Sequence, residues 1–239
     1  IPLLQELELS ESDYHTINDT CKTLGIDLIV TPMDEESAEF ISTLDVVGFK
    51  IASADMTNIS LIKKCASYNL PVLISTGMWS KEDIEKSVSQ YPKSLQFSLL
   101  LANSTYPAPY EDIGLEFLEN LKQLSTTVGY SGHERGTFIP IAAVALGAKI
   151  IEKHLTINKN LTGPDHISSL DYKEFNLMVE LIRKTEIALG KKNKIVTNSE
   201  KKNIQIARKS IVASNVIKKG EKFTEKNITS KRPGTGIDP

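Results

Sequence analysis

The chain has 239 residues, of which 40% are hydrophobic and 24% charged, so it is long and apolar enough to bury a sizeable core. Its formal net charge of −2 excludes the basic footprint of a protein that binds nucleic acid or anionic membranes. The two cysteines, Cys21 and Cys65, form no disulfide framework, and no run approaches the roughly 18 apolar residues of a membrane span. We therefore expect a cytoplasmic protein whose partner is a small molecule, with no nucleic acid and no membrane.

Apolar runs alternate with amphipathic segments along most of the chain. The segment before Glu11 has the pattern of a helix or loop, with no opening strand. Strands are predicted at 27–32, 46–53, 71–74, 95–101, 127–130 and 149–152. Helices are predicted at 11–24, 34–44, 58–68, 80–90, 113–124, 139–146 and 172–189. Asp34 and Ser80 are expected N-caps, and Gly25 the stop of the first helix. Six strand–helix units in succession imply a parallel sheet.

Polar side chains recur at or just past the end of every predicted strand. They are Thr31, then Lys50 and Ser53, Ser75, Ser104 and Tyr106, Ser131 and His133, and Glu152 and His154. An open sheet concentrates its site at one switch point, whereas a barrel gathers residues from every strand around one mouth. The pattern therefore predicts an α/β fold, a partial (β/α)₈ TIM barrel over residues 1–190. Six units cannot close eight strands, so we expect two further units before Ile1.

The composition changes after Gly190. Residues 191–205 are polar and lysine-rich, which predicts a linker. Residues 206–239 are expected to begin a small second domain, with a strand at 209–213, a short capped helix at Thr224–Asn227 and a Gly/Pro-rich loop. Because so few residues cannot form an independent core, this domain is expected to be truncated.

The residues at the strand ends suggest two kinds of chemistry. Lys50 and the surrounding hydroxyls suit a phosphate or a phosphorylated small acid, and no P-loop or GxGxxG motif points to a nucleotide. His133 and His154 would leave coordination positions open on a divalent metal, which can polarise a carbonyl. Glu152 and Asp165 are carboxylates close by in the sequence. A single Ser or His of this kind is more often a packing or capping residue, so the argument depends on the recurrence.

A set of motifs in a fixed order carries a family resemblance. They are Lys50-Ile51-Ala52-Ser53, Ser75-Thr76-Gly77-Met78, Ser104-Thr105-Tyr106-Pro107, Gly129-Tyr130-Ser131-Gly132-His133, Ala142 to Ala148, Glu152-Lys153-His154 and Gly163-Pro164-Asp165-His166. Together they resemble the N-acetylneuraminate (sialic acid) synthase family. The segments 208–211 and 231–234 are similar to the start of its C-terminal antifreeze-like (SAF) domain.

The resemblance implies a barrel that condenses phosphoenolpyruvate with an N-acetylated hexosamine. The favoured sugar is N-acetylmannosamine, and the products are a nine-carbon 2-keto acid and phosphate. It implies that His133 and His154 bind a divalent metal, typically Mn²⁺, with Mg²⁺ or Co²⁺ as alternatives. The implied catalytic residues are His133, His154 and Glu152, and the implied substrate-binding residues are Thr31, Lys50, Ser53, Asp55, Ser75, Ser104, Tyr106, Ser131 and Asp165. A domain-swapped homodimer is implied for the full-length protein.

The sequence leaves alternatives open. The sugar acid can instead be legionaminic or pseudaminic acid, or a precursor of a spore-coat polysaccharide. The resemblance implies that the first two barrel strands, before Ile1, carry a catalytic glutamate and a second phosphoenolpyruvate-binding lysine. The chain can therefore also be a non-catalytic fragment that serves for binding or dimerisation. Gly132 and Ala54 stand where many bacterial members have Asp and Gly, which affects sugar selectivity more than reaction type.

Overall fold

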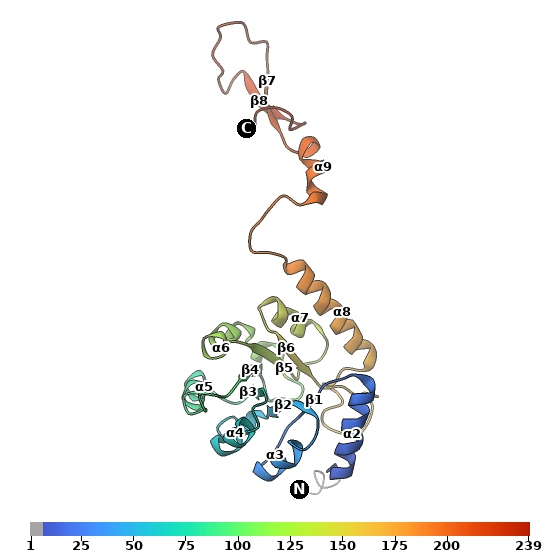
Figure 1. Ribbon diagram of the computed structural model, residues 1–239. Helices are drawn as coiled ribbons and strands as arrows, with labels where there is room; N and C mark the ends of the chain where they lie inside the picture. Colours follow the sequence, from blue (N-terminus) through green and yellow to red (C-terminus); the bar gives the residue numbers. More distant parts are fainter. Residues whose placement is uncertain (1–6) are drawn as a thin grey trace. The chain divides into compact units, whose positions relative to one another are not determined.

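The computed structural model describes residues 7–239. The chain divides into a first unit that ends at Leu189 and a second unit over Gly190–Pro239 (Figure 1). Each unit contains its own sheet, of six strands in the first and two in the second. The helix or loop expected at the start of the chain falls partly on residues 1–6, which lie outside the described residues.

The six strands of the first unit form one parallel sheet whose spatial order is the chain order. They are β1 (Leu28–Val30), β2 (Val46–Ile51), β3 (Val72–Ser75), β4 (Phe97–Ala102), β5 (Val128–Gly132) and β6 (Ile150–Lys153). Each strand pairs in parallel with the next, so β1 and β6 are the two edges. The predicted parallel sheet is confirmed. All the carboxyl ends of these strands meet at one edge of the sheet.

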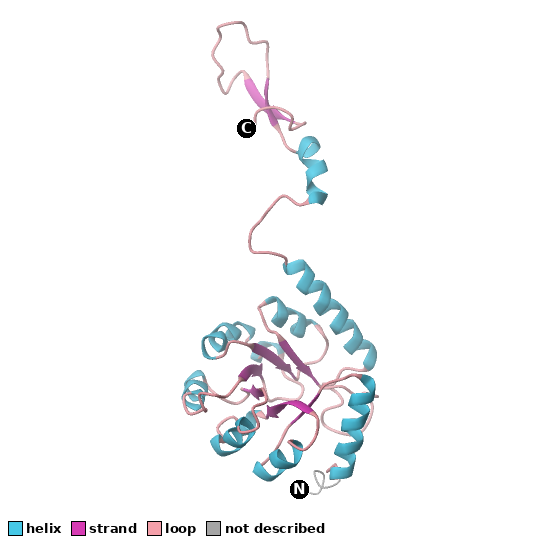
Figure 2. Cartoon of the chain, in the orientation of Figure 1, coloured by secondary structure: helices cyan, strands magenta, loops and turns pink. Residues whose placement is uncertain are grey.

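Helices connect consecutive strands and surround the sheet (Figure 2). They are α2 (Glu11–Leu24), α3 (Glu35–Ile41), α4 (Ile59–Ala66), α5 (Lys81–Val88), α6 (Leu118–Leu124), α7 (Phe138–Ala145) and α8 (Tyr172–Leu189). Three 3₁₀ turns lie between them, η1 (Ser53–Asp55), η2 (Tyr110–Asp112) and η3 (Leu115–Phe117). Asp34 and Ser80 cap α3 and α5 as predicted, and Gly25 ends α2 with φ 66°. None of the described helices has the length and apolar character needed to cross a bilayer.

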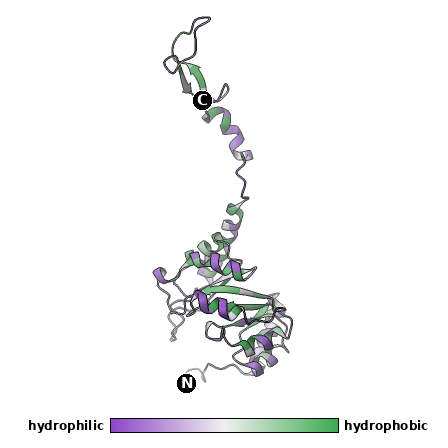
Figure 3. Ribbon diagram, turned by 90° about the vertical axis from the view of Figure 1, so that its left-hand side faces the viewer, coloured by the Kyte–Doolittle hydropathy of each residue, from purple (hydrophilic) through white to green (hydrophobic). Residues whose placement is uncertain are grey.

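The core lies between the sheet and its helices. Phe49, Ile51, Ile74 and Leu99 on the strands are completely buried, together with Leu118 on α6. Figure 3 shows hydrophobic colour along the strands and mixed colour along the helices that cover them. Burial of each such side chain contributes about 1.5–3 kcal/mol. Consecutive parallel strands that curve inside a ring of helices form a partial (β/α)₈ barrel, which confirms the predicted fold class.

The second unit contains a helix and a two-stranded sheet. The helix is α9 (Asn198–Ala207), and β7 (Ser210–Ala213) pairs antiparallel with β8 (Ile228–Lys231). The strand predicted at 209–213 is confirmed as β7. No prediction was made for β8, because four residues that alternate weakly in polarity become a strand only through their partner.

The structure adds a helix within the predicted linker, and it contradicts the helix predicted at Thr224–Asn227. Part of the predicted linker is α9, which buries no residue and so has no apolar stripe that periodicity could detect. Its only local signal is the capping box between Thr197 and Glu200. The predicted helix Thr224–Asn227 is a single turn, in which the N–H groups of Asn227 and Ile228 both donate to the Thr224 carbonyl. It ends there because Ile228 already belongs to β8.

Candidate active site

A cavity of about 630 Å³ opens at the carboxyl ends of the six strands. Every strand contributes to its lining, which consists of Thr31, Met33, Lys50, Ala52, Ser53, Ala54, Ser75, Met78, Ser104, Tyr106, Ser131, Gly132, His133, Glu152, Lys153 and His154. Most of the site residues predicted from the sequence are thus brought into one place. The parallel order of the strands is the reason, since it puts all their carboxyl ends on one rim.

Two predicted residues lie outside this lining. Asp165 belongs to the loop after β6, and its Oδ2 lies 3.9 Å from Nδ1 of His154. Asp55 is the last residue of η1, and its Oδ1 accepts a hydrogen bond from Nδ2 of Asn58 over 3.1 Å. The 3₁₀ turn directs Asp55 toward the start of α4, which the sequence pattern did not reveal.

Lys50 supplies the buried positive charge of the cavity. Its side chain donates to the Ile51 carbonyl over 3.2 Å, and its Nζ lies 3.5 Å from Oε2 of Glu152. Burial lowers the pKa of Lys50, and the neighbouring Glu152 carboxylate opposes that shift. Oε2 of Glu152 is buried without a hydrogen-bond partner among the described residues. The pair is therefore incompletely satisfied, as in a site that receives further polar groups from a ligand.

Hydroxyl groups line the same cavity. The Ser75 hydroxyl is buried without a hydrogen-bond partner among the described residues, and Ser131 is 3% exposed. Ser53 Oγ accepts a hydrogen bond from the Gly77 N–H over 3.0 Å, so its own proton remains for another acceptor. These hydroxyls and Lys50 line one cavity, and such donors suit an anion.

Gly77 brings three strand ends together and was missed as a site residue. A Cβ atom at this position would lie 2.3 Å from Oγ of Ser104 and 2.9 Å from Oγ of Ser53. Only glycine therefore leaves room for both hydroxyls beside the backbone at this position. Trp79 secures the same loop by donating from its indole nitrogen to the Ser53 carbonyl over 2.6 Å. The available signal was the Ser75-Thr76-Gly77 run that directly follows β3.

Two imidazoles form the other half of the cavity. The ring centroids of His133 and His154 are 5.4 Å apart, and the Tyr106 ring lies 4.2 Å and 5.6 Å from them. His133 is 8% exposed, and burial lowers its pKa, which favours the neutral ring. Its Nδ1 donates to the Asn103 carbonyl over 2.6 Å, which leaves the lone pair on Nε2 available.

These donors fit a metal that takes only part of its coordination from the protein. Over residues 7–239, no group of three or more His, Cys, Asp or Glu side chains is arranged to enclose a metal ion. Neutral imidazoles nevertheless suit divalent transition metals, and an open site keeps positions for substrate oxygens. Asp165, beside His154, is the carboxylate placed to orient that ring.

Fold and site together define a (β/α)-barrel protein with an anion-binding half and an imidazole half in one mouth. The NeuB family model matches residues 1–194, and the chain belongs to the NeuB family, which confirms the resemblance predicted from the motifs.

Known proteins support this assignment. An uncharacterized protein of Methanocaldococcus jannaschii is 42% identical over 99% of this chain and 71% of its own length. The N,N'-diacetyllegionaminic acid synthase of Campylobacter jejuni is 40% identical over 99% of this chain and 72% of its own. The crystal structure of an N-acetylneuraminic acid synthetase from Leptospira borgpetersenii superposes with a TM-score of 0.77 at 33% identity. That match covers 82% of this chain and 70% of the other.

Proposed function

We propose that the protein condenses phosphoenolpyruvate with the aldehyde form of an N-acetylated amino sugar. The products are a nine-carbon 2-keto sugar acid and inorganic phosphate. The observation that carries this proposal is the joining of two half-sites in one cavity, with Ser75 Oγ and Glu152 Oε2 buried there without a hydrogen-bond partner among the described residues. Membership of the NeuB family and the sugar-acid synthases among its relatives support it.

The phosphoenolpyruvate half is built around Lys50. Its ammonium group offsets the negative charge of the phosphate and carboxylate groups, in a site where low exposure strengthens the attraction. The hydroxyls donate to the phosphate and carboxylate oxygens, and they belong to Thr31, Ser53, Ser75, Ser104 and Ser131. This arrangement holds the enol with its C3 carbon facing the imidazole half.

The sugar half contains His133 and His154. A divalent metal held by these rings, Mn²⁺ by preference with Mg²⁺ or Co²⁺ as alternatives, would supply a Lewis acid for the sugar aldehyde. Tyr106, in the cavity lining, and Asp165, beside His154, are the residues that would contact the sugar hydroxyls. C3 of the enol forms the new bond to the aldehyde carbon with the electrons of the C2–C3 double bond, and the aldehyde oxygen becomes a hydroxyl with a proton that the attacking water releases. Water adds at C2, and the C2–O bond to phosphate breaks to leave the ketone. Oε2 of Glu152 is the group placed to take the proton of that water.

Two sugars are candidates. The sequence motifs favour N-acetylmannosamine, and the Leptospira N-acetylneuraminic acid synthetase supports that choice. The Campylobacter relative, whose product carries two acetyl groups, supports a 2,4-diacetamido sugar as the second candidate. The match to the Campylobacter relative covers 99% of this chain, and the match to the Leptospira synthetase covers 82%. Pseudaminic acid and spore-coat precursors belong to the same reaction type.

A phosphate-release assay tests the proposal. Purified full-length protein is given phosphoenolpyruvate, Mn²⁺ and a panel of N-acetylated and 2,4-diacetamido sugars. We expect release only when all three components are present, with one sugar giving the highest kcat/KM and with loss of activity after chelation. If no sugar of the panel leads to phosphate release, the alternative that the chain is a non-catalytic binding or dimerisation module is favoured. Sedimentation of the same sample tests the expected homodimer.

A further inference from the structure

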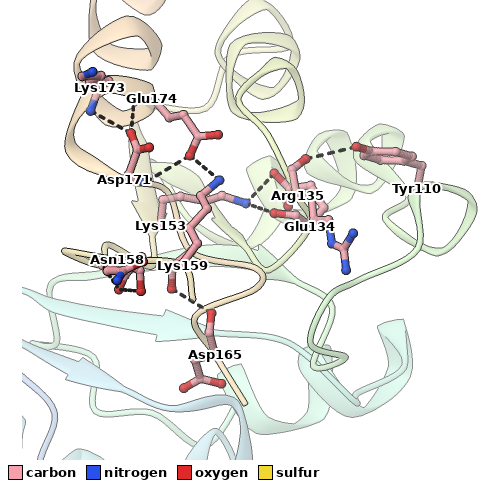
Figure 4. Close-up of polar contacts among 12 residues, drawn as sticks. Tyr110, Glu134, Arg135, Lys153, Asn158, Lys159, Asp165, Asp171, Lys173 and Glu174 are labelled. Atoms are coloured by element: carbon pink, nitrogen blue, oxygen red, sulfur yellow. Dashed lines mark hydrogen bonds and ion pairs between the residues drawn. The ribbon is translucent and has the colours of Figure 1, made fainter. Parts of the chain in front are cut away.

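A buried ion pair joins Glu134, the residue after His133, to Lys153, the residue before His154. Lys153 Nζ donates to Oε1 of Glu134 over 2.9 Å and also to the Glu134 backbone carbonyl, and neither side chain has any exposed surface. The hydroxyl of Tyr130 donates to the second carboxylate oxygen over 2.6 Å. Figure 4 shows the Lys153 amino group directed at Glu134. Such pairs contribute little net stability because desolvation offsets the attraction, so stability alone does not account for this one.

Gly132 provides the space that the carboxylate occupies. A Cβ atom at position 132 would lie 2.8 Å and 3.1 Å from the two carboxylate oxygens of Glu134, and 2.7 Å from Cε1 of Tyr130. The Glu134 side chain thus folds back over Gly132. Its two hydrogen-bonding partners leave it no easy alternative position. Any side chain at position 132 displaces the carboxylate.

The ion pair joins β5 and β6 at the point where their backbone hydrogen bonding ends. The last paired residues of β5 and β6 are Gly132 and Lys153. His133 and His154 are the next residues along each strand, so the ladder does not hold them. Glu134 directly follows His133, and Lys153 directly precedes His154. The pair therefore ties together the two backbone segments that carry the imidazoles.

We propose that Glu134, held by Lys153 and Tyr130 over Gly132, is a positioning residue that sets the separation and orientation of the His133 and His154 rings. The proposal rests on the proposed function only for the role of these rings as metal ligands. The arrangement of the rings themselves is a property of the chain without metal.

Titration with Co²⁺ alone, followed by its visible absorption, tests the positioning role. The variants are Glu134→Gln, Lys153→Met, Gly132→Ala and Tyr130→Phe. We expect Co²⁺ binding weakened by roughly 10- to 100-fold in the first three, with an altered spectrum, and a smaller change in Tyr130→Phe. Tyr91→Phe is the matched control, since Tyr91 is another buried tyrosine and its hydroxyl donates to the Met56 carbonyl over 2.8 Å. Tyr91→Phe should lose about as much thermal stability as Tyr130→Phe, with no change in Co²⁺ affinity or in the Co²⁺ spectrum.

A second measurement needs no metal. The ¹⁵N resonances of the two imidazoles should move in the metal-free Glu134→Gln and Tyr130→Phe proteins and stay in place in Tyr91→Phe. Unchanged resonances together with unchanged Co²⁺ binding would overturn the positioning role. If wild-type protein binds no Co²⁺, the metal part of the proposed function fails, and the resonances decide the positioning role by themselves. If Lys153→Met does not fold, Tyr130→Phe, which removes a single hydroxyl, gives the answer.

Discussion

The two ends of the same strands each carry a cavity of similar size. The one at the carboxyl ends has a volume of about 630 Å³ and the one at the amino ends about 520 Å³. The amino-end cavity is lined by Pro71, Leu95, Gln96, Phe97, Ser98, Leu124, Ser125, Thr126 and Thr127, none of them charged. Its buried Ser125 hydroxyl lies 2.9 Å from the carbonyl oxygens of both Phe97 and Thr127. The Ser75 hydroxyl at the opposite end has no such partner among residues 7–239.

This difference teaches that volume does not identify a binding site in this fold. A buried hydroxyl without a partner costs free energy, and a ligand that supplies the partner recovers it. At the amino ends the buried Ser125 hydroxyl serves the fold and is satisfied within it. At the carboxyl ends Ser75, Glu152 and Lys50 retain unsatisfied hydrogen-bonding or charge capacity. The contrast can be tested by the same change at each end.

Removal of an imidazole should have the largest effect. We expect His154→Ala to reduce metal-dependent phosphate release to background, because one remaining imidazole cannot hold the metal against solvent. Gln96→Ala, at the amino-end cavity, is the control and should keep wild-type kcat and KM. Full activity in His154→Ala would remove the imidazole half from the proposed site.

Removal of a hydroxyl should act in opposite ways at the two ends. Ser125→Ala deletes a satisfied hydrogen bond, so we expect the free energy of unfolding to fall by about 1 kcal/mol with unchanged kinetics. Ser75→Ala deletes a buried hydroxyl that has no hydrogen-bond partner among the described residues, so the free energy of unfolding should stay the same or rise by about 1 kcal/mol, while the KM for phosphoenolpyruvate rises roughly 10-fold. Urea unfolding and steady-state kinetics measure both. Equal stability losses in the two variants would mean that Ser75 is satisfied within the fold.

A smaller, pH-dependent effect is expected away from both cavities, at Cys65. Burial raises the pKa of this thiol from 9.0 to about 11. Between these values the folded protein keeps a proton that the unfolded chain loses, so this residue's contribution to stability falls as pH rises from about 9 to about 11. The measurement is chemical unfolding of wild type and Cys65→Ala across this range. The variant should show the shallower decline, and identical slopes would contradict the shift.

Much of the fold followed from local patterns in the first unit. Strands that are buried on both faces give continuous apolar runs, so β1 to β6 and the helices between them were predicted. In the second unit α9 and β8 were missed, since one buries no residue and the other is a strand only because β7 pairs with it. The turn at Thr224 was assigned as a helix because a single turn and a helix start share the same capping residues.

The sequence by itself determined most of the polar residues that reach the mouth of the barrel. Each of these residues lies at or just past the end of an apolar strand, and parallel strands must end on a common rim. Only the tertiary structure decided which of their polar atoms are satisfied and which are not. That distinction depends on contacts between residues distant in sequence, such as Gly77 with Ser104 and Lys153 with Glu134. Local patterns carry no record of such contacts, because packing distances are set by the whole fold.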